Sequence, residues 1–367
     1  MQYDIQLTPR KDVPQWIVYG TPIFTVVAAL IVTGFALIAL GFDPVEGFYY
    51  MFVDTLTTGY GLSETLIRAI PLIFAGLAVY IPLKANLWNI GAEGQLIVGA
   101  AAGTFVALNL SAPMYLLLPA MFLVAAFAGA VWGGIPGWLR AKWGINEIIT
   151  TLLMTFIAIN LLSYIVRGPM RGDGGNFPQT DLLPAVARLP DIPGIGVNIG
   201  LILAIGGVVA TYFLFTRTHL GFQITVVGSN ENAAAQSGIN KARIYLFVLV
   251  AGGILAAFAG ISEIAGNQSR LQSTFEPGYG FTAIPIALLG RNGAFKVMLA
   301  AVFFAVLFVG GQSMSIAIGV PSALIEIIQA LVILFLITAE FFKRYEVEIV
   351  SKQQMDQSQN AATGGEI

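Results

Sequence analysis

Two carboxylates lie in stretches of the chain that are otherwise nearly free of charge, where they could contact a polar solute. Glu326 is followed three residues later by Gln329, which puts both side chains on one face of a helix. Glu93 is followed by Gln95 at the end of the glycine-containing segment 86–95 (NLWNIGAEGQ). Carboxylates and amides in such surroundings bind a passing solute or relay a proton, and Glu326 is the strongest candidate to face a functional interior.

Segment 86–95 also holds side chains suited to a heterocyclic solute. Amides supply hydrogen bonds and a tryptophan supplies a flat ring for stacking. Each has a structural alternative, because Asn and Glu beside glycines cap broken helices and a tryptophan at a membrane boundary fixes depth. Glu147 and Glu263, at the ends of apolar stretches, are interpreted as interfacial. The predicted solute pathway comprises Asn86, Trp88, Asn89, Glu93, Gln95, Asn160, Glu326 and Gln329.

Catalysis by the chain itself is nearly excluded by what the sequence lacks. There is no cysteine, and the single histidine, His219, cannot form an imidazole cluster for zinc. No G-x-x-x-x-G-K-[ST] phosphate loop, nucleophile elbow or H-E-x-x-H string occurs. We therefore expect no cofactor or metal in this chain, and if its function uses ATP, the ATPase is another subunit.

The composition is that of a protein embedded in a membrane. Of 367 residues, 57% are hydrophobic and only 10% are charged, and the mean hydropathy is +0.80. Soluble domains carry roughly 25% charged residues, so most of this surface must face something other than water. The net charge of −2 also argues against nucleic acid as a partner. These figures predict an all-α, polytopic membrane protein in the lipid bilayer.

The apolar stretches predict about ten transmembrane helices, since a bilayer core needs about 20 apolar helical residues. Segment 277–290 is short enough to be a half-inserted helix. The polar residues 1–16 form a cytoplasmic N-terminal segment, 17–342 the transmembrane domain, and 343–367 a cytoplasmic tail that is partly disordered beyond Lys352. The predicted spans are 17–40, 69–83, two within 95–139 separated near 109–113, 148–166, 197–216, 244–262, 277–290, 297–310 and 322–342.

The basic residues predict that both termini are cytoplasmic. With ten spans, thirteen of the 18 lysines and arginines fall on the same side as the N-terminus, as the positive-inside rule requires. The external loops would hold only five. The inside set is Arg10, Lys11, Lys84, Arg140, Lys142, Arg217, Lys241, Arg243, Arg291, Lys296, Lys343, Arg344 and Lys352, and the outside set is Arg68, Arg167, Arg171, Arg188 and Arg270.

Two connections and two glycine patterns stand out. The external loop 167–198 contains five prolines, which make it either a stiff, irregular surface or a simple spacer. Small residues recur every fourth position at Gly129, Gly133 and Gly137, a spacing that lets membrane helices approach closely. The same holds for Gly252, Ala256 and Gly260.

The internal connection 217–243 predicts a short helix. Asn230 is the N-cap and Glu231 lies in the first turn, while Gly238 ends the helix. The residues between are mostly alanines, so the helix is small and smooth. It either docks in a groove of a partner or is an ordinary surface helix.

Several strings in this order resemble one known subgroup of permeases. The chain is similar, over about residues 15–342, to the first of two permease subunits in ABC importers for purine nucleosides. That subgroup belongs to the wider family that includes ribose and galactose importers. The strings are 86–95, 144–153 (GINEIITTLL), 167–171 (RGPMR), 176–179 (NFPQ), 221–239 with its GSNENAAAQSGI core, 277–291 (PGYGFTAIPIALLGR), 310–312 (GGQ) and 321–329 (PSALIEIIQ).

The resemblance implies a fold, partners and a coupling site. The fold is that of ribose- or vitamin-B12-type importer permeases, in the cytoplasmic membrane. The partners are a second homologous permease, a cytoplasmic ATPase with two fused nucleotide-binding modules that holds ATP and magnesium, and a lipid-anchored external binding protein. The loop 167–198 becomes a docking surface for that protein. The coupling helix is carried over onto Gly228, Asn230, Glu231, Ala233, Ala234 and Gly238.

One departure lies beside that helix, where Thr225, Val226 and Val227 precede Gly228 at a place where relatives often have a basic residue. The resemblance implies ATP-driven import of a nucleoside, guanosine-like, or of a related sugar-containing solute. The alternative is a stand-alone secondary transporter with Glu326 or Glu93 as proton relay. An embedded enzyme ranks third, since no nucleophile, metal set or acid–base pair is evident.

Overall fold

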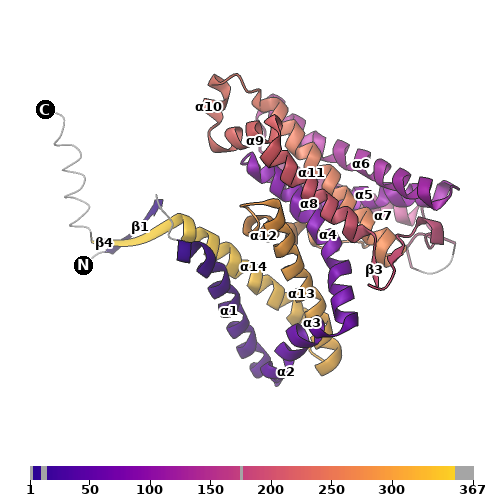
Figure 1. Ribbon diagram of the computed structural model, residues 1–367, viewed down its shortest axis with the longest axis horizontal. Helices are drawn as coiled ribbons and strands as arrows, with labels where there is room; N and C mark the ends of the chain where they lie inside the picture. Colours follow the sequence, from indigo (N-terminus) through magenta and orange to yellow (C-terminus); the bar gives the residue numbers. More distant parts are fainter. Residues whose placement is uncertain (1–2, 10–14, 174–176, 352–367) are drawn as a thin grey trace. The chain divides into compact units, whose positions relative to one another are not determined.

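The protein is helical almost throughout the part that the structure describes, residues 3–9, 15–173 and 177–351 of a computed structural model (Figure 1). It comprises two compact units. The larger is Val45–Pro321, and the smaller joins Met1–Pro44 with Ser322–Ile367.

The larger unit holds most of the helices, joined by short connections. The helices longer than fifteen residues are α4 (Gly59–Lys84), α5 (Ala92–Asn109), α6 (Met114–Trp143), α7 (Glu147–Arg167), α8 (Gly200–Arg217), α11 (Lys241–Glu263) and α13 (Ala294–Ile318). The shorter elements are α2 (Pro44–Phe48), η1 (Tyr49–Asp54), α3 (Thr55–Thr57), η2 (Ala185–Ala187), β2 (Asp191–Ile192), β3 (Val197–Asn198), α9 (His219–Ser229), α10 (Glu231–Gln236), η3 (Ile264–Gln268) and α12 (Tyr279–Leu289).

Helices α4 and α11 form the core of this unit, with α5, α6 and α8 packed around them (Figure 1). The most apolar part of α4 is 83% buried and that of α11 is 61% buried, whereas the values for α7 and α8 are only 22%. The exposed side chains of α7 and α8 are largely apolar. These outer helices therefore have a surface suited to lipid, and the two inner helices are covered by protein.

Glycines permit the close packing of α11, as the sequence predicted. A Cβ atom on Gly129 of α6 would collide with the carbonyl oxygen of Gly253, and one on Gly260 would collide with that of Leu96 in α5. Gly252 faces α4, where a Cβ would lie 2.6 Å from the carbonyl oxygen of Ala78. Without side chains at these positions the backbones come close enough for extensive dispersion contact.

All ten predicted spans coincide with helices, although their bounds and lengths differ. Among the described residues, seven helices are long and apolar enough to cross a membrane. Helix α12 has 11 residues, about 16 Å at 1.5 Å per residue, so the segment 277–290 is only a half-length helix. Helix α4 begins ten residues before the predicted span 69–83, which places Arg68 inside a helix instead of in an external loop.

The smaller unit joins the two ends of the chain. Helix α1 (Gln15–Ala39) packs against α14 (Ser322–Arg344). Strands β1 (Tyr3–Pro9) and β4 (Tyr345–Ser351) form an antiparallel pair running from Tyr3 opposite Ser351 to Pro9 opposite Tyr345. The predicted terminal segments 1–16 and 343–367 thus contribute a strand each. The predicted disorder beyond Lys352 lies outside the described residues.

Candidate functional site

The connection between α8 and α11 folds into two helices, of which the sequence predicted one. Asn230 caps α10 as expected, with its Oδ1 accepting from the backbone N–H groups of Asn232 and Ala233, both at 3.0 Å. Gly238 ends the helix in a left-handed conformation, φ 77°. The preceding helix α9 was missed. It begins at the N-cap Thr218, whose hydroxyl accepts from the N–H of Gly221 at 3.0 Å.

The six residues predicted to couple to an ATPase do not all face outward. Ala233 is exposed, whereas Ala234 is fully buried by other residues of this chain. Gly228 belongs to α9, and a Cβ there would collide with the carbonyl oxygen of Lys84 at the end of α4. Gly228 and Ala234 therefore fix this hairpin to the larger unit. The surface that α10 presents consists of Asn232, Ala233, Ala235 and Gln236.

Charges at the α10 end of the unit are paired near the surface. Glu231 contacts Lys241 at 3.4 Å, with both side chains more than 40% exposed. The Tyr245 hydroxyl and the Lys241 ammonium group lower the pKa of the Glu231 carboxyl. Arg140 at the end of α6 lies 3.4 Å from Glu147 at the start of α7. Glu147, which the sequence analysis interpreted as interfacial, is thus buried and paired with Arg140.

Asn89 and Gln95 form a closed amide pair in the interior. Asn89 Nδ2 donates to Gln95 Oε1 at 2.8 Å, and Gln95 Nε2 donates back to Asn89 Oδ1 at 3.0 Å. Asn89 also donates to the carbonyl of Ala78 at 3.2 Å. Both side chains are buried. Their hydrogen-bonding groups are occupied by one another, so they join α4 to the start of α5.

Glu93 caps helix α12. Its Oε1 accepts from the N–H of Gly278 at 2.9 Å and its Oε2 from the N–H of Gly280 at 2.6 Å. The side chain is fully buried. A carboxylate at a helix N-terminus compensates the unpaired N–H groups and the helix dipole. The structure therefore gives Glu93 the capping role that the sequence allowed as an alternative to solute contact.

The remaining pathway candidates are dispersed. Asn86 is exposed with φ 58°, and the Trp88 backbone N–H donates to Glu147 Oε1 at 3.4 Å. Asn160 is exposed on α7 and donates to the carbonyl of Phe156 at 2.8 Å. In the smaller unit, Glu326 is exposed and Gln329 is half-buried on α14. Within the larger unit the structure thus assembles Asn89 with Gln95, but no site containing all these residues.

A buried charge cluster at the other end of α11 was missed by the sequence analysis. Glu263 is 1% exposed and lies 3.9 Å from Arg68 Nη1. Its Oε2 accepts from the Tyr279 hydroxyl at 3.4 Å, and Arg68 donates to the same hydroxyl. Asn267 and Gln268 donate to Oε1 at 2.9 and 3.1 Å. The sequence analysis interpreted Glu263 as interfacial and did not foresee these partners, although two opposite charges within apolar stretches were a signal for pairing.

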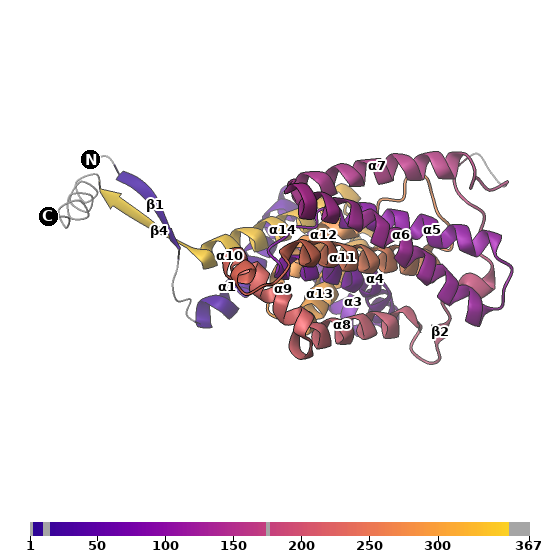
Figure 2. The same ribbon diagram turned by 90° about the horizontal axis from the view of Figure 1, so that it is seen from above.

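The proline-containing loop 167–198 lies near this cluster, and Figure 2 shows α10 and β2 toward opposite ends of α11. The loop is tied to the segment that follows α11 by backbone hydrogen bonds and by the Asn198 side chain. The bonds are Leu189 N–H to Ala265 O, 2.9 Å, Leu183 N–H to Ser269 O, 2.8 Å, Thr180 N–H to Leu271 O, 2.9 Å, Ser273 N–H to Pro178 O, 3.0 Å, and Asn198 Nδ2 to Gly266 O, 3.2 Å.

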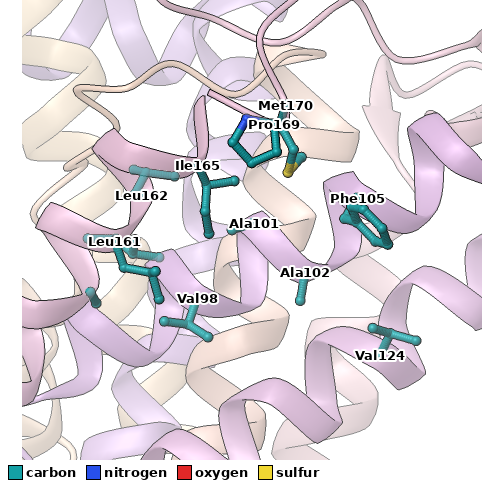
Figure 3. A pocket seen from close by; sticks show the side chains of 12 residues that line it. Val98, Ala101, Ala102, Phe105, Val124, Leu161, Leu162, Ile165, Pro169 and Met170 are labelled. Carbon is teal, nitrogen blue, oxygen red and sulfur yellow. The ribbon is translucent and has the colours of Figure 1, made fainter. Parts of the chain in front are cut away.

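Two cavities in the larger unit have apolar walls. One of about 370 Å³ lies between α5, α6 and α7, and Val98, Phe105, Leu162 and Met170 are among the side chains that line it (Figure 3). The other, about 1220 Å³, lies between α4, α6, α8 and α11. Neither is lined by a charged or amide side chain. Tyr115 and Thr211 are the hydroxyl-bearing residues in the wall of the larger cavity. A sugar or nucleoside would lose most of its hydrogen bonds to water in either cavity, so both suit hydrocarbon better.

Comparison with known proteins shows which protein family this chain matches. Residues 61–337 match the family described as the permease component of branched-chain amino acid transport systems. The chain is 58% identical, over its whole length and 99% of the relative, to a glucose ABC transporter permease, TsgB13, of Haloferax volcanii. It is 30% identical, over 86% of this chain and 91% of the relative, to the guanosine ABC transporter permease NupP of Bacillus subtilis. A putative glucose permease of Haloferax volcanii, TsgC13, is 25% identical over 74% of this chain and 83% of the relative.

Proposed function

From the premise that this chain belongs to the permease-component family of branched-chain amino acid transport systems, we propose that it carries glucose or a similar hexose as one subunit of an ATP-driven importer. The chain is a multi-pass ABC permease without an ATPase site of its own. The observation that supports a hexose is the 58% identity to a glucose permease along the entire chain.

A nucleoside is the second candidate solute. The strings 86–95 and 221–239 resemble nucleoside importers, and the guanosine permease of Bacillus subtilis is 30% identical over 86% of this chain. That identity is much lower than the identity to the glucose permease, so the hexose ranks first. Glucose and guanosine both contain a sugar ring with several hydroxyl groups, and a pathway selective for hydroxyl groups would serve either.

The mechanism is alternating access. Closure of a partner ATPase moves helix α10, and the helices attached to the α9–α10 hairpin swing the pathway from outward- to inward-facing. Gly228 packs α9 against the end of α4, which gives the hairpin a rigid connection to the most buried helix. The exposed face of α10 contacts the ATPase through Asn232, Ala233, Ala235 and Gln236.

An importer of this kind also requires partner proteins for this chain. Haloferax volcanii has two permeases that are similar to this chain, a glucose permease and a putative glucose permease, and a second permease accordingly accompanies this chain. A cytoplasmic ATPase with two fused nucleotide-binding modules binds ATP and magnesium, and this chain holds no cofactor. A lipid-anchored binding protein delivers the solute to the 167–198 loop, and both termini face the cytoplasm.

Uptake by cells that lack the gene tests the solute. Radiolabelled glucose uptake should fall in the deletion strain and recover when this chain is restored, while guanosine uptake stays unchanged. The reverse pattern would overturn the hexose in favour of the nucleoside. Uptake that persists after ATP depletion but collapses with the proton gradient would overturn ATP-driven import.

Crosslinking tests the coupling helix, because the chain has no native cysteine. A single cysteine at exposed Gln236 should crosslink to the partner ATPase in native membranes. A cysteine at Thr216, which is exposed at the end of α8, is the matched control and should not. Equal crosslinking at both positions, or none at Gln236, would contradict the assignment of α10.

The predicted pathway residues are tested through Glu326. Glu326 is exposed on α14 with half-buried Gln329 on the same helix, as a pair lining a pathway would be. Glu326→Ala should impair uptake while the complex still assembles, and Glu46→Ala in a surface helix is the matched control. Normal uptake by the Glu326 variant would remove its role.

A further inference from the structure

We propose that Glu263 is a positioning residue for transport, which links the position of the 167–198 loop to that of half-helix α12. The inference rests on the proposed function, since it concerns how an external binding protein affects the interior of the permease. Three contacts lead from the loop to α12, and all lie within the larger unit.

The first contact joins the loop to the segment after α11. Four backbone hydrogen bonds of 2.8–3.0 Å connect residues 178–189 with residues 265–273. Asn198 adds a side-chain bond to the carbonyl of Gly266 at 3.2 Å and caps the start of α8 by accepting from the N–H of Gly200 at 2.9 Å. A displacement of the loop therefore carries the 265–273 segment with it, because several bonds would otherwise break together.

The second contact joins that segment to Glu263. Residues Ile264–Gln268 form a π-helix, a wider turn that often occurs at functional sites. The wider turn brings Asn267 and Gln268, four and five residues beyond Glu263, to the same carboxylate oxygen at 2.9 and 3.1 Å. The orientation of the carboxylate is thus set by the π-helix to which the loop is bound.

The third contact joins Glu263 to two separate helices. Its other oxygen accepts from the hydroxyl of Tyr279, the first residue of α12, at 3.4 Å. Arg68 of α4 lies 3.9 Å from the carboxylate and donates to the same tyrosine hydroxyl. One carboxylate therefore contacts the segment held by the loop, the central helix α4 and the start of α12.

A role in positioning explains why charges occur here at all. A buried ion pair contributes little more stability than well-packed apolar side chains would, so stability alone does not account for the pair. Helix α12 is short, and its start is held by two carboxylates, Glu93 on its N–H groups and Glu263 on the Tyr279 hydroxyl. Of these two, Glu263 is the one connected to the loop.

The test uses the complete complex in liposomes: both permeases, the ATPase and the binding protein. The rate of ATP hydrolysis is measured with and without binding protein loaded with the solute that the wild type takes up. Glu263→Gln should reduce the stimulation about tenfold, within the range of coupling between two sites, while basal hydrolysis stays the same. Glu276→Gln, an exposed carboxylate in the same connection, is the matched control and should keep full stimulation.

A second variant separates positioning from stability. Arg68→Gln/Glu263→Gln removes both charges, so neither is left buried without its partner. Positioning predicts that this double variant assembles with wild-type yield and thermal midpoint but keeps the low stimulation. Recovery of stimulation together with stability would overturn the inference, as would wild-type stimulation in Glu263→Gln. A wild-type complex that imports neither glucose nor guanosine would instead overturn the proposed function.

Discussion

The two ends of helix α11 hold their charges in opposite ways. At its start, Lys241 pairs with Glu231 at 3.4 Å and both side chains are more than 40% exposed. At its end, Glu263 is 1% exposed. It accepts hydrogen bonds from the π-helix η3 and from α12, and it forms an ion pair with Arg68 of α4. The two ends lie about 33 Å apart along the helix, at 1.5 Å per residue.

The difference indicates different tasks. The α10 end presents a short helix with exposed small and polar side chains and an exposed ion pair, while Gly228 and Ala234 fix its other side to the larger unit, as suits a surface that follows a partner. The cluster around Glu263 is held by mutual hydrogen bonds, as suits a part whose geometry must be kept in the low-dielectric interior. Substitutions at the two ends should therefore differ greatly in their effect on stability.

The largest loss of stability is expected from Glu263→Ala. It leaves Arg68 and the Tyr279 hydroxyl without the carboxylate, and breaking a buried pair in this way costs about 3–5 kcal/mol. The thermal midpoint of the detergent-purified chain should fall strongly, whereas Glu276→Ala should leave it unchanged. An unchanged midpoint for Glu263→Ala would contradict the contrast between the two ends.

A smaller loss is expected midway along α11, from Gly129→Ala in α6. The added methyl group would collide with the carbonyl oxygen of Gly253, and overpacking of this kind costs about 1–3 kcal/mol. Gly134→Ala is the matched control on the same helix, because its methyl group would lie 3.4 Å from Val250. The midpoint should fall for the first variant only. Equal midpoints would show that α6 and α11 separate easily.

At the α10 end, Asn230→Ala should destabilise α10 by about 1 kcal/mol, the usual contribution of an N-cap. Amide hydrogen exchange in residues 231–236 should become faster while exchange in α11 stays the same. Asn232→Ala, at an exposed position that does not cap the helix, serves as control. Faster exchange throughout α11 would contradict the view that this end is held only locally.

The smallest effect is expected from Lys241→Gln, since exposed ion pairs contribute about 0–1 kcal/mol. The pKa of Glu231 is lowered in the folded chain, so this contribution is present above the ordinary carboxyl pKa and is lost as the pH falls through the lowered value. The midpoints of variant and wild type should differ slightly at neutral pH and converge in acid. A difference that grows in acid would have the wrong sign.

Much of the fold could be predicted from the sequence because it depends on local patterns. Long apolar runs specify membrane helices, and Asn230 followed by Glu231 specifies a helix start. The failures are also local in origin. Helix α9 has no long apolar run, and Arg68 was taken as the end of a span because charges usually lie at span ends, although here the helix continues past it.

The candidate site could be predicted only in part. The polar residues of segment 86–95 were recognised as unusual, but their partners were not. Glu93 accepts from Gly278, 185 residues away, and Arg68 bonds to Tyr279, 211 residues away. No periodicity in the sequence relates such pairs.

The membrane environment, the helical segments and the short capped helix α10 could be derived from the sequence, because each follows from composition or from neighbours within one helical turn. Which buried charge meets which depends on the tertiary structure. The Glu263 cluster, the Glu93 cap and the Asn89–Gln95 pair arise where α4, α5, α11 and α12 converge, and the packing of helices far apart in the chain brings them together there.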